Sequence, residues 1–146
     1  MLYSKPCEHA IRAMAYLALQ PQARLVRAVE VADAEGIGLP FLARILHQLA
    51  RAGLLSSRKG PGGGFQLAKS PRHITLRDIV EQMDGLESFD ECAAGLARCS
   101  DQMPCPLHHI WKDLRGRISG YLEKTSLAEM AQAVDRKRAA TSARSA

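Results

Sequence analysis

The chain has 146 residues and a mass of 16.0 kDa, enough for one domain with one appended element and too short for a multidomain enzyme. Its 47% hydrophobic and 24% charged residues are typical of a folded globule and exclude both a disordered chain and a disulfide-stapled miniprotein. The net charge of +5 comes from residues 1–75, which carry ten basic and four acidic side chains, whereas residues 76–146 carry ten and eleven.

A basic first half is the kind of surface that nucleic acid binds, although an ordinary basic surface has the same composition. The N-terminus lacks the basic segment, apolar stretch and cleavage site of a signal peptide, and no run of about 18 apolar residues could span a membrane. We therefore expect a cytoplasmic protein without membrane contact. Its four cysteines should stay reduced there, as metal or redox ligands rather than disulfides.

Short helical patterns separated by glycine and proline fill the first part of the chain. Apolar residues at helical spacing predict helices over 8–19, 28–35 and 39–52, and residues 24–26 allow a short strand. The second and third helices, joined by a glycine-containing turn, form a helix-turn-helix pattern whose second helix would contact DNA through its polar face. The candidate DNA-contacting residues on that face are Pro40, Arg44, His47, Gln48 and Arg51.

A basic, glycine-rich turn over residues 59–64 lies between two strand-like segments at 54–58 and 65–68. A helix-turn-helix followed by a hairpin is the winged-helix arrangement, in which glycines let the backbone approach the sugar-phosphate edge. The expected wing contacts are Arg58, Lys59 and Gly60. A nucleotide-binding P-loop is disfavoured, because the turn lacks the Gly-Lys-Ser/Thr ending and leads into a strand.

The second half of the chain predicts a helix over 74–83, an irregular segment over 84–106 and a long helix over 106–124. The long helix is about 28 Å in length, more than a domain of this size could cover, so its apolar stripe should pair with a second copy. The expected dimerisation residues are Ile110, Trp111, Leu114, Ile118, Tyr121 and Leu122. Ser126 and Glu129 form a capping-box pattern for a short final helix that ends near Val134.

The irregular segment holds three of the four cysteines, separated by six and five residues, and a histidine follows the last of them. The candidate ligands are Cys92, Cys99, Cys105 and His108, while His109 points about 100° away around the helix. Three thiolates and one imidazole suit tetrahedral zinc or an iron–sulfur cluster, and the wide spacing leaves room for a cluster. Three incidental cysteines are disfavoured because cysteine is scarce, and Cys7 is expected to be a small buried hydrophobe.

Together these motifs are similar to those of the IscR/NsrR family of bacterial winged-helix transcription regulators that bind an iron–sulfur cluster, over about residues 1–130. The residues that carry the resemblance are Gly53-Leu54-Leu55, the Gly60-Pro61-Gly62-Gly63-Gly64-Phe65 turn, the three-cysteine loop and Trp111-Lys112-Asp113-Leu114. The resemblance implies a homodimer that pairs through the long helix, binds a palindromic operator on double-stranded DNA, and responds to cluster supply, iron, redox stress or nitric oxide.

The resemblance also implies that the three loop cysteines hold a 2Fe-2S or a 4Fe-4S cluster. Some members of the family use a histidine as the fourth ligand, here His108, and others an acidic residue early in the first helix, here Glu8. Both candidates are present, so the fourth ligand and the cluster type stay open. The chain departs from the cluster-biogenesis regulators in the wider spacing of its first two cysteines and in Ala43, which stands where they have an acidic residue.

The sequence therefore predicts a mainly α fold with a small β-hairpin wing, in which a winged helix-turn-helix is followed by a long C-terminal dimerisation helix. The expected segments are a DNA-binding domain (1–83), a cluster-binding loop (84–106), a dimerisation helix and short C-terminal helix (107–135) and a disordered tail (136–146). The predicted function is a homodimeric regulator, repressor or activator, that senses redox or iron state through its cluster. The alternative is a zinc-stabilised regulator without a sensing role. An enzyme is disfavoured, because no nucleophile elbow, paired carboxylates or cofactor glycine motif accompanies the cysteines.

Overall fold

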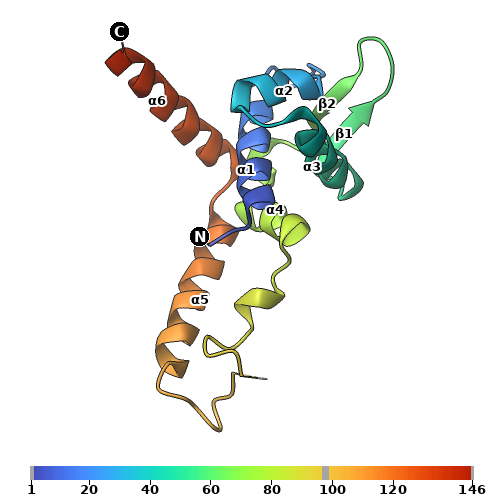
Figure 1. Cartoon of the computed structure of the whole chain (residues 1–146). Helices are drawn as coiled ribbons and strands as arrows, with labels where there is room; N and C mark the ends of the chain where they lie inside the picture. The colour runs from blue at the N-terminus through green and yellow to red at the C-terminus, as the bar shows by residue number, and fades with distance from the viewer. Residues whose placement is uncertain (1, 97–98, 146) are drawn as a thin grey trace.

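Helices and a two-stranded hairpin make up the computed structural model, which describes residues 2–96 and 99–145 (Figure 1). In chain order the elements are α1 (Lys5–Ala18), α2 (Ala28–Glu35), α3 (Leu39–Arg51), β1 (Leu55–Arg58), β2 (Gly64–Leu67), the 3-10 helix η1 (Pro71–His73), α4 (Leu76–Met83), the 3-10 helix η2 (Glu87–Phe89), α5 (His108–Lys124) and α6 (Leu127–Ser145). The mainly α fold with a small hairpin is confirmed. No helix in the described ranges is long and apolar enough to cross a membrane.

Helix α1 is the centre of the core, and α2, α3, α4 and α6 pack against it. The Ser4 side chain starts the helix by accepting the backbone N–H of Cys7 at 3.2 Å. Three of the fully buried residues of α1 are Ala10, Ala13 and Ala15. Their small side chains let the neighbouring helices approach closely. Cys7 is fully buried in this core, as expected, and burial raises the pKa of its thiol to about 12.

The wing is attached to the segment that precedes α2. Gly36 caps the C-terminal end of α2 with a φ of 64°, in the left-handed region, and the chain then reverses direction before α3 begins. Val26 and Phe65 exchange two backbone hydrogen bonds, of 2.8 and 2.7 Å, so the short strand expected at 24–26 is a single bridge to β2. A Cβ at Gly64 would lie 2.5 Å from the Val26 carbonyl oxygen, so only glycine fits at this crossing.

The start of α4 is joined to the junction between α5 and α6. The Leu76 N–H donates to the Thr125 carbonyl at 3.0 Å, and the Leu127 N–H donates to the Ile74 carbonyl at 2.7 Å. Away from this junction α5 extends from the winged domain, with the irregular loop running along it (Figure 1). Leu122 was expected on the dimer face, but it is 1% exposed because the last turns of α5 pack into the core of the same chain.

The C-terminal helix differs most from its prediction. It does not end near Val134 before a disordered tail, because α6 continues to Ser145. The tail is rich in alanine, lysine and arginine, which have high helix propensity, and Arg138 pairs with Glu35 of α2. The capping box of Ser126 and Glu129 is present at its start. Residues 97–98 of the expected loop and residue 146 of the expected tail lie outside the described residues.

Candidate functional site

One face of α3 is polar, basic and exposed. Leu42, Ile45, Leu46 and Leu49 are buried on the inner face, which holds the helix against the core. The exposed residues on the outer face are Pro40, Arg44, His47 and Arg51. Their spacing of four, three and four residues places them on one stripe, so α3 presents two guanidinium groups and an imidazole to solvent.

Gln48 does not belong to this exposed stripe. Its Nε2 donates to the backbone carbonyl of Gln82 at 2.6 Å, at the end of α4, and its side chain therefore supports the packing of α3 on α4. His47 packs edge-on against Phe65 of β2, with 5.3 Å between ring centroids. That contact fixes the orientation of the α3 face relative to the wing. This contact occupies one amide hydrogen of Gln48, and its role as a base-reading residue stays a prediction.

The three expected wing residues are exposed at the tip of the hairpin: Arg58, Lys59 and Gly60. The turn is compact, since a Cβ at Gly63 would lie 2.2 Å from the Arg58 carbonyl oxygen. Gly60 and Gly62 have φ of 86° and 73°, values that favour glycine. The hairpin therefore carries two cations on a narrow backbone.

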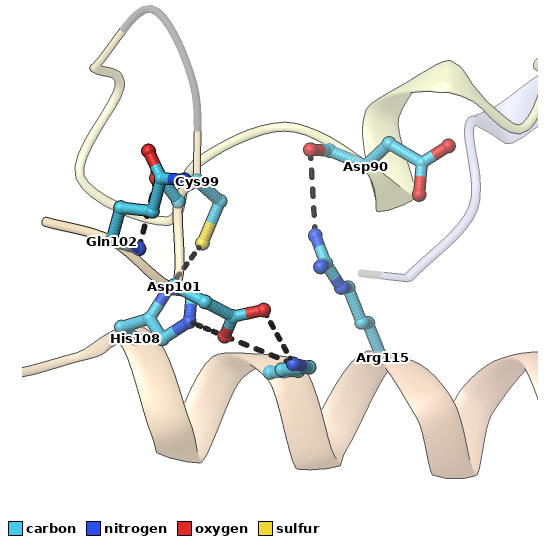
Figure 2. A network of polar contacts seen from close by, with 8 residues as sticks. Asp90, Cys99, Asp101, Gln102, His108 and Arg115 are labelled. Atoms are coloured by element: carbon cyan, nitrogen blue, oxygen red, sulfur yellow. Dashed lines mark hydrogen bonds and ion pairs between the residues drawn. The ribbon is translucent and has the colours of Figure 1, made fainter. Parts of the chain in front are cut away.

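A buried imidazole connects the cysteine loop to the start of α5. Nδ1 of His108 lies 2.9 Å from the Cys99 sulfur, and its Nε2 lies 2.7 Å from Oδ1 of Asp101 (Figure 2). Lys112, one turn further along α5, donates to both Asp101 oxygens at 2.9 Å. These hydrogen bonds, from Lys112 first and His108 second, lower the pKa of Asp101 to about 2. His108 is 3% exposed, and its neighbour His109 is exposed.

The environment of Cys92 differs from that of Cys99. The backbone N–H groups of Ala94 and Leu96, and in smaller part the Cys105 thiol, interact with Cys92 and lower the pKa of its thiol. The Cys105 carbonyl accepts the His108 N–H at 3.0 Å, so Cys105 lies at the start of α5. The Cys92 environment favours the thiolate, which is the form that binds metals.

The four donors match the chemistry of a zinc or iron–sulfur site, and two of them, Cys99 and His108, are in direct contact. Across residues 2–96 and 99–145, no three His, Cys, Asp or Glu side chains are grouped closely enough to enclose a metal ion. Glu8 pairs with Lys5 at 2.8 Å on α1, and in the described part of the chain it makes no polar contact with the loop.

The amino-acid sequence matches the family model Rrf2, described as an iron-dependent transcriptional regulator, over residues 3–133. The chain belongs to the Rrf2 family. It is 37% identical over 132 residues to an HTH-type transcriptional regulator of Aquifex aeolicus, and the match covers 89% of this chain and 91% of that one. It is 31% identical over 122 residues to the HTH-type transcriptional regulator IscR of Escherichia coli O1:K1, covering 84% and 75%.

Two solved structures resemble the fold of this Rrf2 protein. IscR of T. potens has a TM-score of 0.71 at 25% identity and covers 92% of this chain and 88% of its own. CymR, the global cysteine regulator of B. subtilis, has a TM-score of 0.75 at 22% identity and covers 90% of this chain and 97% of its own. At this identity the similarity is evidence for the fold and not for the function. The protein is an Rrf2-type, IscR-like winged-helix transcriptional regulator, and its relatives are regulators rather than enzymes, as expected.

Helix α5 of this Rrf2 protein carries an exposed apolar stripe. Leu107, just before the helix, and Ile110, Leu114 and Tyr121 within it are between 39% and 64% exposed. Trp111 is partly buried where it meets the loop, and Ile118 is partly buried against the hydrophobic core. The Trp111 indole donates to the Glu91 carbonyl at 2.8 Å, which holds the loop against α5.

Sequence reasoning missed Asp101 and Lys112 as members of the site. Both could have been found from spacing, since Asp101 lies between two candidate ligands and Lys112 stands four residues after His108 on the same helix. It also missed the buried carboxylate of Glu35, whose partners Arg12 and Arg138 lie far away in the chain. No local pattern marks that contact.

Proposed function

We propose that this Rrf2 protein binds operator DNA under the control of an iron–sulfur cluster held by its cysteine loop. The observation that carries the proposal is the contact between Cys99 and His108, 2.9 Å apart at the start of α5. Three thiolates and one imidazole form a donor set used for clusters and for zinc. The family description as an iron-dependent regulator favours iron.

The proposed ligands are Cys92, Cys99, Cys105 and His108. His108 is preferred as the fourth ligand because it already lies against Cys99, whereas Glu8 is paired with Lys5 on α1. When bound, the cluster would make the protein respond to reduction, oxidants, nitric oxide or the availability of iron.

The chain attaches the loop to α5 at a second point. Arg115 donates to the carbonyls of Phe89 and Asp90 at 3.5 and 3.4 Å, next to the indole contact of Trp111. A rearrangement of the loop therefore acts on α5 directly. Because α5 contacts α4, and α4 contacts α3, the same rearrangement can reach the DNA-binding face.

A second copy of the chain would cover the apolar stripe of α5. Exposed leucine and isoleucine side chains at helical spacing are suited to pairing with the same helix of another copy. The dimer would present two α3 faces to a palindromic operator whose half-sites lie about 34 Å apart. A small change in the crossing of the two α5 helices would then misalign one half-site.

The proposed DNA contacts divide into two kinds. Arg44, His47 and Arg51 would enter the major groove, where arginine binds guanine through two hydrogen bonds. Pro40 lies at the N-terminal end of the same face, which faces the DNA in helix-turn-helix proteins. Arg58, Lys59 and the Gly60 backbone would contact phosphates beside the groove.

Anaerobic purification tests the cluster proposal. The protein should be brown, contain iron and sulfide, and bind operator DNA with an affinity that changes when the cluster is removed. Cys99→Ala should bleach it, whereas the matched Cys7→Ala variant should keep its colour, because Cys7 lies in the core on α1. His108→Ala and Glu8→Gln report the fourth ligand through the visible absorption of the cluster.

A zinc-stabilised regulator is the competing outcome, since zinc accepts the same donors. A colourless protein that contains one zinc ion per chain and binds its operator fully would overturn the cluster proposal. If operator affinity is the same with and without the cluster, only the proposed control of DNA binding by the cluster is overturned.

A further inference from the structure

Both ring nitrogens of His108 have a partner, and the two partners differ in chemistry. Nδ1 faces the Cys99 sulfur at 2.9 Å, and Nε2 faces the Asp101 carboxylate at 2.7 Å (Figure 2). Both partners come from the loop, while His108 stands in the first turn of α5. The imidazole thus bridges two loop residues that lie two positions apart in the chain.

Asp101 is fixed although its side chain is 68% exposed. Lys112 donates to both of its oxygens at 2.9 Å, and Lys112 stands four residues after His108, on the same face of α5. A carboxylate group beside Nε2 suits the tautomer of His108 that carries its proton on that nitrogen. The Nδ1 lone pair is then directed toward Cys99 and is available to a metal.

We propose that Asp101, held by Lys112, is a positioning residue that fixes the Nε2-protonated form of His108 and directs Nδ1 to the metal centre. The inference rests on the cluster of the proposed function and adds the residue that orients its nitrogen ligand. Carboxylate partners of metal-bound histidines set ring orientation and make the ring a stronger donor. Asp101 contributes no ligand atom itself.

Isotope labelling tests which nitrogen binds. The full-length protein is purified anaerobically with histidine labelled by ¹⁵N at Nδ1 alone or at Nε2 alone, and the reduced cluster is measured by pulsed EPR. We expect the strong hyperfine coupling to arise from the Nδ1 label. Strong coupling from the Nε2 label, or no histidine coupling to a cluster that is present, would overturn the inference.

Variants of Asp101 test its effect on the site. Asp101→Asn and Asp101→Ala should shorten the lifetime of the cluster toward an iron chelator by about 10- to 100-fold, and should shift its reduction potential to more positive values. Lys112→Met should act in the same direction with a smaller change, because the carboxylate is retained. An Asp101→Asn protein with the lifetime and potential of the wild type would contradict the proposal.

The matched control is Asp113→Asn. Asp113 has the same side chain as Asp101 and directly follows Lys112 on α5. It pairs with Arg117 at 3.0 Å and takes no part in the His108 contacts. Asp113→Asn should keep the wild-type cluster lifetime and reduction potential. If Asp113→Asn and Asp101→Asn shorten the lifetime equally, loss of a negative charge near the site explains the effect and the proposal is contradicted. Failure of the proposed function is distinguishable, because the wild type would then contain no iron–sulfur cluster to measure.

Discussion

Glu35 of α2 and Arg138 of α6, 103 positions apart in the sequence, form an ion pair in which the carboxylate is fully buried. Arg12 of α1 completes the arrangement, since its Nε lies 3.0 Å from the second carboxylate oxygen and its Nη2 donates to the Glu35 carbonyl at 2.5 Å. One buried charge therefore joins the first helix of the helix-turn-helix to the central helix and to the C-terminal helix.

Removing one guanidinium should destabilise the protein, because the buried carboxylate would keep only one cationic partner. We expect Arg138→Met to lower the free energy of unfolding by about 1–3 kcal/mol. Arg144→Met, an exposed change near the end of the same helix, should alter it by less than about 0.5 kcal/mol. Urea denaturation followed by circular dichroism measures both free energies of unfolding. A change for Arg138→Met as small as that for Arg144→Met would mean that the contact with Glu35 adds nothing to stability.

Adding a methyl group to a glycine should have opposite effects at two positions. Gly64→Ala places a Cβ 2.5 Å from the Val26 carbonyl oxygen, so it should destabilise the hairpin and weaken DNA binding. Gly116→Ala lies in α5 with open space around it, and should stabilise the protein by up to about 1 kcal/mol. Thermal unfolding compares the two variants, and a Gly64→Ala protein as stable as the wild type would contradict the close approach.

A charge within the α5 stripe should separate the proposed dimer. Ile110 is 64% exposed, and Ile110→Lys should yield a folded monomer in analytical ultracentrifugation together with weaker operator binding. Ser119→Lys lies half a helical turn away around α5 and should remain dimeric. If the Ile110→Lys variant dimerises at the same protein concentrations as the wild type, the interface lies elsewhere.

Substitutions on the two DNA-binding elements should differ in sequence dependence. Arg44→Ala should weaken operator binding by about 1–3 kcal/mol and relax the preference at one base pair. Lys59→Ala should weaken binding to all sequences and lower the slope of affinity against salt concentration by about 1. Gln48→Ala should leave base preference unchanged, because its amide is bonded to Gln82. Fluorescence anisotropy over a range of salt concentrations separates these outcomes.

Local patterns account for the parts of the fold that were predicted well. The range of α2 agrees residue for residue, because its apolar spacing and the glycine after it are both local signals. The hairpin followed from its glycines, and the capping box of α6 from two residues three positions apart. The third helix agreed to within one residue at its end.

Contacts between distant segments account for what was missed. The tail looked too polar to fold, but Arg138 reaches Glu35 in a helix more than a hundred positions away. Leu122 belongs to the periodic stripe of α5, yet the stripe enters the core at the last turn of the helix. The pattern of α3 likewise does not reveal that the Gln48 amide donates to the Gln82 carbonyl of α4. Periodicity locates a helix face, and the neighbouring elements decide what covers it.

The indole of Trp111 bonds to the carbonyl of Glu91, the residue directly before Cys92. It is the only tryptophan in the chain. The intrinsic fluorescence of the protein under tryptophan excitation therefore originates beside the cysteine loop, three residues after His108. Binding of the proposed cluster should therefore quench this fluorescence, which would report cluster loading without an added label.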